Sequence, residues 1–96
     1  MAQQQSTRRT ADHDTIRKWA EERNARPTRV KRTGSGGDPG ILRLDFPGYS
    51  GEEELEEISW NEFFRKFDES DLELVYQERT AAGEVSNFNK LVQRQH

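Results

Sequence analysis

The stretch ISWNEFFRKFDES, residues 58–70, carries the strongest local structural signal in this chain. Ser59 followed three positions later by Glu62 forms a capping box, a pattern that marks the start of a helix. The aromatic residues of the stretch recur at positions i, i+3, i+4 and i+7, so their rings leave one side of a helix of about ten residues. We therefore predict that this helix lies at the centre of the core, with four rings buried rather than offered to a ligand: Trp60, Phe63, Phe64 and Phe67.

A second, shorter helix is predicted upstream, in the segment TIRKWAEERN at residues 15–24. Asp12 or Asp14 can cap its start, and Asn24 can end it in a left-handed conformation before Pro27. Three apolar residues of this segment have the spacing of one helical face and should join the core: Ile16, Trp19 and Ala20.

Three segments alternate β-forming or apolar residues with charged or polar ones, with the period of a half-buried strand. The glycine-rich GSGGDPG, residues 34–40, separates the first two and predicts a hairpin turn. The end of the chain is ambiguous, because VSNF at residues 85–88 fits a short fourth strand whereas FNKLVQR fits a helical turn. The three strand segments are residues 28–33 (TRVKRT), 41–46 (ILRLDF) and 71–79 (DLELVYQER).

These elements predict an α+β fold with the order αββαβ(β), in which two helices cover one face of a small, mainly antiparallel sheet of three to four strands. Residues 1–11 are polar and lack apolar periodicity, so we expect a disordered leader there. A single domain then spans residues 12–93, and residues 94–96 form a frayed end.

Composition excludes several classes of site. The 96-residue chain contains no cysteine, which rules out disulfides, thiolate zinc sites and thiol nucleophiles. No stretch approaches the roughly 18 apolar residues of a membrane span, and the N-terminal residues lack the apolar core of a signal peptide. We expect a cytoplasmic protein without a membrane or metal partner.

Charge is distributed unevenly along the chain. Residues 1–33 contain nine basic and four acidic residues, whereas residues 34–96 carry a net charge of −8. The basic residues predict either a solvated or internally paired face, which we favour, or a phosphate-contacting patch that binds nucleic acid. The candidate phosphate or partner contacts are Arg17, Lys18, Arg23, Arg26, Arg29, Lys31 and Arg32.

Motifs that suggest catalysis are incomplete. The glycine-rich loop lacks the Lys and Ser or Thr of a phosphate-binding loop, and a strand rather than a helix follows it. GYSG at residues 48–51 is one residue short of a nucleophile elbow, and the acidic run EEELEE at residues 52–57 lacks calcium-loop spacing. We therefore predict no catalytic, cofactor-binding or metal-binding residue and no enzyme. If the protein were an enzyme, Asp45, Glu62 or His13 would be its acid or base.

Three segments resemble a family of small uncharacterised bacterial proteins of about 80 to 100 residues. They contain the motifs RKWAEER (17–23), DPGILR (38–43) and LEEISWNEFF (55–64). The resemblance covers residues 12–93 and implies glycine at the positions of Asn24 and Arg32. Relatives sometimes labelled glucan branching enzymes do not change the prediction, because that chemistry uses a barrel of roughly 250 residues. The resemblance implies no activity and no catalytic residue.

The absence of a catalytic set, together with the uneven charge, favours a non-enzymatic interaction module. Such a protein would be an adaptor that binds an unknown protein partner, or it would form a homodimer. We expect its functional surface to combine the basic first hairpin with the acidic loop at residues 48–57, and nucleic-acid binding through residues 23–32 is the alternative.

Overall fold

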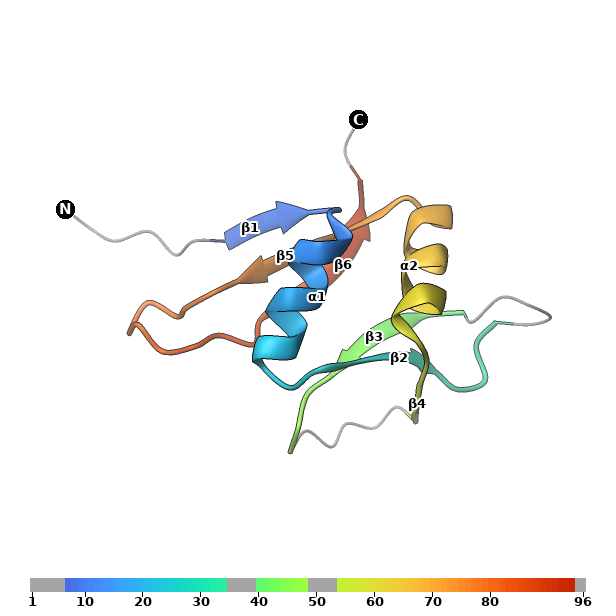
Figure 1. Cartoon of the computed structure of the whole chain (residues 1–96), viewed down its shortest axis with the longest axis horizontal. Coiled ribbons are helices and arrows are strands. Elements are labelled where there is room, and N and C mark those ends of the chain that lie inside the picture. The colour runs from blue at the N-terminus through green and yellow to red at the C-terminus, as the bar shows by residue number, and fades with distance from the viewer. Residues whose placement is uncertain (1–6, 35–39, 49–53, 95–96) are drawn as a thin grey trace.

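The computed structural model describes residues 7–34, 40–48 and 54–94 and has the predicted α+β class. The described residues form two helices and six strands (Figure 1). Their bounds are β1 Thr7–Thr10, α1 His13–Glu22, β2 Arg26–Val30, β3 Leu42–Asp45, β4 Leu55–Glu57, α2 Trp60–Glu69, β5 Leu72–Gln77 and β6 Asn89–Gln93.

The strands form two antiparallel sheets instead of the single sheet that we predicted. One sheet has the order β1-β5-β6 and the other the order β3-β2-β4. Because β1 and β6 occupy both edges of β5, and β3 and β4 occupy both edges of β2, the two central strands cannot pair with each other. In Figure 1, α1 crosses β5 and β6, while α2 runs from the level of β5 down to β2 and β3.

The predicted disordered leader is wrong for its last residues, because Thr7–Thr10 form β1. This strand pairs with β5 in the register Arg9↔Val75, and the Arg9 Nε atom lies 2.8 Å from a carboxylate oxygen of Glu73. The sequence TRRT contains no apolar residue, so periodicity does not reveal it. The open edge of β5 creates this strand, and residues 1–6 lie outside the described residues.

The acidic run also contains a strand that we did not predict. Leu55–Glu57 form β4, which pairs antiparallel with β2 in the register Arg29↔Glu56. We expected a solvated approach to the second helix, and a three-residue strand with one apolar side chain has too few positions for an alternating pattern. The glycine-rich turn and the GYSG motif fall largely on residues 35–39 and 49–53, outside the described residues.

The C-terminal ambiguity resolves as a strand placed later than VSNF. β6 spans Asn89–Gln93, and Val85 contributes only an isolated bridge to Arg79. The helical-turn alternative is therefore wrong. Arg94, which we assigned to a frayed end, is held in place because its backbone N–H donates to Asp71 O at 2.8 Å and its Nε donates to Leu72 O at 2.6 Å.

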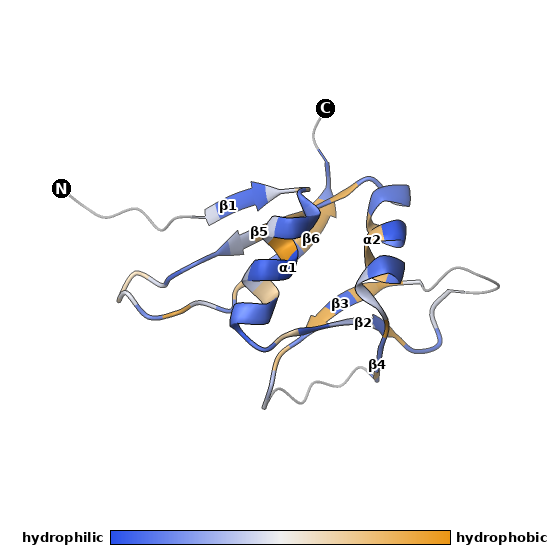
Figure 2. Cartoon of the chain, in the orientation of Figure 1, coloured by the Kyte–Doolittle hydropathy of each residue, from blue (hydrophilic) through white to orange (hydrophobic). Residues whose placement is uncertain are grey.

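Both helices begin where the sequence predicts. The Asp12 carboxylate caps α1 by accepting from the Thr15 backbone N–H at 2.9 Å. Hydrogen bonds from the Thr15 side chain and backbone lower the pKa of Asp12. Ser59 caps α2, its hydroxyl oxygen accepting from the Glu62 N–H at 3.0 Å. Figure 2 shows hydrophilic residues on the outer sides of both helices. No helix in the described part of the chain is long and apolar enough to cross a membrane.

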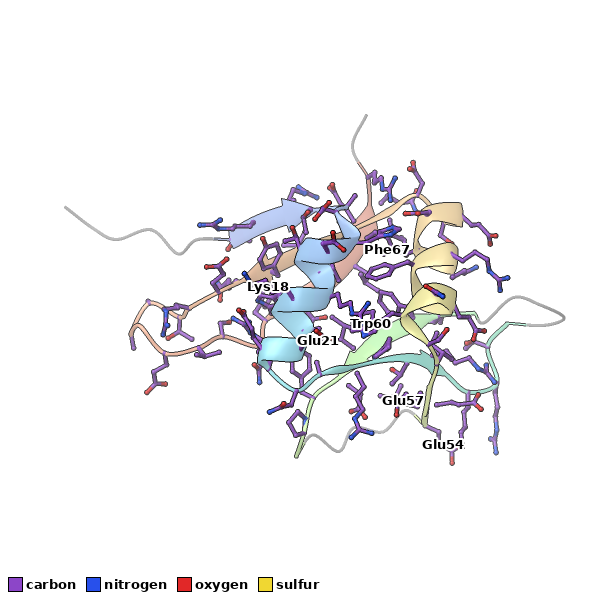
Figure 3. All side chains as sticks on the ribbon, viewed as in Figure 1. Lys18, Glu21, Glu54, Glu57, Trp60 and Phe67 are labelled. Carbon is purple, nitrogen blue, oxygen red and sulfur yellow. The ribbon has the colours of Figure 1, made fainter. Side chains whose placement is uncertain are left out.

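The aromatic face of α2 forms the centre of the core, as predicted. Phe63 and Phe67 are completely buried and Phe64 is 8% exposed, while Trp60 is half-buried against the same cluster. Figure 3 shows Trp60 and Phe67 pointing from α2 toward the interior. The cluster also contains residues from α1 and from both sheets, so a single core joins them: Ile16, Trp19, Ala20, Leu42, Leu44, Leu74 and Tyr76.

Three described residues other than glycine adopt the left-handed region, namely Asn24, Arg32 and Asp71, and the first two bear on the resemblance. Asn24 ends α1 with φ of 58°, as predicted, and Arg32 has φ of 69° after β2. A left-handed non-glycine residue costs roughly 1–2 kcal/mol, less for Asn, whose side chain tolerates this region. These are the two positions at which the resemblance implies glycine, so the backbone gives a physical reason for that expectation.

Phe67→Ala should destabilise the protein by about 3–5 kcal/mol, because truncating a fully buried ring removes burial and leaves a cavity. Phe88→Ala is the matched control, because Phe88 is 48% exposed and its loss should cost below about 1 kcal/mol. Urea unfolding, monitored by tryptophan fluorescence, measures the free energy of unfolding of both variants. Equal losses of that free energy would contradict the assignment of α2 as the core helix.

Candidate functional site

The basic segment does not form an open cationic patch, because three of its arginines face β4. Arg29 Nε lies 2.8 Å from Glu56 Oε1, and Arg26 Nη1 lies 3.1 Å from Glu57 Oε1. Arg32 Nη2 approaches Glu54 Oε1 at 4.0 Å. The antiparallel register of β2 and β4 places these opposite charges side by side, and Figure 3 labels Glu57 at the end of β4 and Glu54 just before the strand. The internally paired alternative accounts for this part of the segment.

Arg23 has a structural environment rather than a surface one. Its side chain is only 5% exposed, and its guanidinium lies 4.4 Å above the centre of the Trp19 ring. The three guanidinium nitrogens donate to backbone carbonyls of Ser86, Trp19 and Glu78 at 2.6, 3.0 and 2.9 Å. Burial lowers the pKa of Arg23, while the nearby Glu22 and Glu78 charges act in the opposite direction. Arg23 therefore joins the end of α1 to the loop between β5 and β6.

The remaining basic candidates are dispersed. Arg17 pairs along α1 with Glu21 at 3.1 Å, an ordinary i,i+4 contact. The side chains of Lys18 and Lys31 are exposed, on α1 and after β2 respectively. The structure thus does not bring the seven predicted contacts together as one surface.

The three acid–base candidates do not meet either. His13 stacks on Phe64 with ring centres 4.1 Å apart, at the start of α1, whereas Glu62 lies in the first turn of α2 and Asp45 ends β3. Within residues 7–34, 40–48 and 54–94, no group of three or more His, Asp or Glu side chains could hold a metal ion.

His13 does belong to a polar cluster that joins α1, α2 and the C-terminal segment. Its Nε2 atom lies 3.0 Å from Asp68 Oδ2, and Arg94 Nη2 donates to Asp68 Oδ1 at 2.8 Å. Partial burial acts to raise the pKa of Asp68, but the hydrogen bonds from His13 and Arg94 outweigh it and lower that pKa. The cluster therefore holds α1, α2 and the C-terminal segment together.

A groove that we did not predict lies where edge strands of the two sheets approach each other. Two adjoining hollows of about 490 and 300 Å³ share Arg43 of β3 and Asn89 of β6. We call them together the edge groove. Its described lining residues are Leu42, Arg43, Leu44, Phe46, Pro47, Gly48, Leu55, Asn87, Asn89, Lys90 and Leu91.

Both strands that border the edge groove turn backbone groups toward it. Val30 N–H donates to Ile41 O at 2.8 Å, so Ile41 and every second residue after it turn their backbone groups toward β2. The backbone groups of Leu42 and Leu44 therefore face the free edge of β3. On β6, Gln77 N–H donates to Phe88 O at 3.3 Å, so Phe88 and every second residue after it turn their backbone groups toward β5. The residues between them turn their backbone groups to the edge away from β5. Those residues are Asn89, Leu91 and Gln93.

The edge groove combines an apolar floor with positive charge. Leu42 and Leu44 are buried and Leu91 packs against the core, whereas Arg43 and Lys90 are exposed. No Asp or Glu is among its described lining residues, although the whole chain carries a net charge of −3. Sequence analysis missed this site because it left residues 84–93 open. The adjacent apolar residues Leu91 and Val92, between Lys90 and Gln93, are the signal that could have placed β6 here rather than at residues 85–88.

Arg23→Ala should destabilise the protein by about 2–3 kcal/mol, because it leaves three backbone carbonyls without their donors. Arg26→Ala is the control, since the Arg26 side chain is 68% exposed and its surface ion pair contributes about 0–1 kcal/mol. Chemical denaturation measures the difference, and equal effects would show that Arg23 is not a structural residue.

Asp68→Asn should lower stability at neutral pH by at most about 1 kcal/mol, because its ion pairs are largely exposed. The lowered pKa means that ionised Asp68 stabilises the fold above its ordinary value of 3.8, and that this contribution disappears as pH falls through the folded-state pKa. The difference between the variant and the original protein should therefore shrink below about pH 4. Thermal unfolding from pH 2 to 7 tests this, and a constant difference would contradict it.

Comparison with known proteins finds no matching family model, no similar curated protein and no similar solved structure. The resemblance to small bacterial proteins therefore stays a prediction, and function is inferred from the geometry of this chain.

Proposed function

We propose that this protein is a non-enzymatic interaction module that binds an extended acidic segment of a partner protein in the edge groove. The carrying observation is that edge strands of two different sheets, β3 and β6, border one hollow without pairing with each other. An exposed strand edge can accept an additional strand through main-chain hydrogen bonds.

The backbone of β6 supports this mode of binding. Asn89, Leu91 and Gln93 alternate with the residues that pair with β5, so their N–H and C=O groups face the free edge. An added strand could form hydrogen bonds there without disturbing the β5–β6 pairing. Leu42, Leu44 and Leu91 supply apolar surface for alternate side chains of that strand.

Charge selects the class of partner. Arg43 and Lys90 are the two charged residues of the described lining, and both are positive. An acidic segment would complement them, whereas a basic one would be repelled. This surface replaces the basic hairpin and acidic loop that we expected from the sequence, because those charges largely neutralise each other between β2 and β4.

Nucleic-acid binding through residues 23–32 has less support. Arg23 is buried against Trp19, and Arg26 and Arg29 already contact carboxylates. Phosphate contacts would require these ion pairs to break.

A bacterial origin and a cytoplasmic location remain predictions from the sequence.

Binding can be tested with a labelled eight-residue peptide that alternates Glu and Val. The amide resonances of the protein are recorded as the peptide is added. We expect shifts in β3 and β6, and about fivefold weaker binding for Lys90→Glu, because the reversed charge repels the peptide. Lys31→Glu makes the same charge change on an exposed side chain outside the edge groove and should leave the affinity unchanged.

Three controls separate the alternatives. A Lys–Val peptide that binds equally well would contradict the role of charge, and shifts confined to β2 on adding duplex DNA at low salt would favour the nucleic-acid alternative. Light scattering that detects dimers of the original protein, but not of Lys90→Glu, would make a second copy of the chain the occupant of the edge groove.

A further inference from the structure

A second hollow, of about 600 Å³, lies on another part of the molecule, between α1 and the hairpin of β5 and β6. We call it the α1 pocket. It shares no lining residue with the edge groove, so the inference drawn from it is independent of the proposed function. Its described lining residues are Thr15, Lys18, Trp19, Glu22, Arg23, Tyr76, Glu78, Arg79 and Val85.

The Tyr76 hydroxyl is the first feature that indicates a ligand. Tyr76 is 5% exposed, and its ring packs edge-on against Trp19 with centres 5.7 Å apart. Within the described part of the chain, its hydroxyl has no hydrogen-bond partner. Every described side-chain oxygen or nitrogen that is sealed from solvent does have a hydrogen-bond partner. The hydroxyl must therefore reach solvent, and Tyr76 is among the residues that line the α1 pocket. A buried tyrosine usually satisfies its hydroxyl, so this one has hydrogen-bonding capacity to spare.

Two cations at the rim are the second feature. Lys18 is exposed and makes no ion pair with any described residue, and Figure 3 shows it on the side of α1 toward the end of β5. Arg79 donates to the Gly83 carbonyl at 3.0 Å but faces no carboxylate within ion-pair distance in the described chain. Both side chains therefore retain donors for a ligand anion.

The wall of the α1 pocket is rigid and already neutralised. Arg23 is held by three backbone carbonyls and lies 3.6 Å from Glu22 Oε1, so this pair contributes little net charge. The charges left over are those of Lys18, Arg79 and Glu78, which sum to a single positive charge. Val85, which is 57% exposed, adds an apolar edge beside them.

We propose that the α1 pocket binds a small organic anion that carries one negative charge and an apolar body. The anionic group lies between Lys18 and Arg79 and accepts a hydrogen bond from the Tyr76 hydroxyl. The apolar body packs against Val85 and the edge of Trp19. A single charge matches the net charge of the lining, and the apolar edge favours an organic carboxylate over inorganic phosphate.

Benzoate is the test ligand, with inorganic phosphate and benzylamine as comparisons, each titrated into the full chain up to about 10 mM while amide and indole resonances are recorded. We expect benzoate to shift the indole N–H of Trp19, which donates to Gln77 O at 2.9 Å beside the pocket, together with amides of α1 and β5. No benzoate shift, or stronger binding of benzylamine or phosphate, would overturn the proposal.

Two variants locate the contacts. Tyr76→Phe should weaken benzoate binding about tenfold, because one hydrogen bond to a charged acceptor is lost, while the unfolding midpoint stays unchanged since the hydroxyl has no partner within the described protein. Lys18→Gln should weaken binding roughly threefold, whereas the matched Lys31→Gln should have no effect. Unaltered affinity in both Tyr76→Phe and Lys18→Gln would place benzoate elsewhere and refute the site.

Discussion

Burial of the aromatic face of α2 is the interaction on which the rest of this structure depends. Phe63, Phe64 and Phe67 belong to one cluster with Leu42 and Leu44 of one sheet and with Leu74 and Tyr76 of the other. A sheet with one apolar face must bury that face against another element. Because the same helix covers part of both sheets, neither can shed that cover without exposing the residues that hold the other. The protein therefore has one core, although it has two sheets.

Charge organises the surface around that core. The excess of basic residues near the N-terminus and the excess of acidic residues later in the chain meet across β2 and β4, where Arg26, Arg29 and Arg32 face Glu57, Glu56 and Glu54. Pairing within the fold removes most of the field that would attract a polyanion to this segment. What remains is a positive edge groove between the sheets and a separate pair of cations, Lys18 and Arg79, at the α1 pocket. Lys90 at the edge groove, and Lys18 and Arg79 at the α1 pocket, make no ion pair with any described residue.

The success of sequence analysis followed the range of the interactions involved. Both helices, their caps and their buried faces were predictable, because capping and i, i+3, i+4 periodicity act within a few residues. β1 and β4 were missed, because TRRT and LEE have no alternation of their own and become strands only beside the open edges of β5 and β2. The candidate basic residues were correctly recognised as charged, but their partners come from strands that sequence analysis did not predict. The edge groove was missed for the same reason, since β6 forms one of its borders.

By itself, the sequence determined the α+β class, the two helices, the aromatic core face and the absence of cysteine chemistry, because each of these follows from residue type or from spacing within one element. Only the tertiary structure decided that the strands divide into two sheets, that Arg23 is buried and that the Tyr76 hydroxyl has no partner among the described residues. These features depend on which distant segments meet. The three carbonyls that hold Arg23 lie on α1 and in the segments flanking the β5–β6 turn, and nothing in the local sequence of Arg23 specifies that encounter.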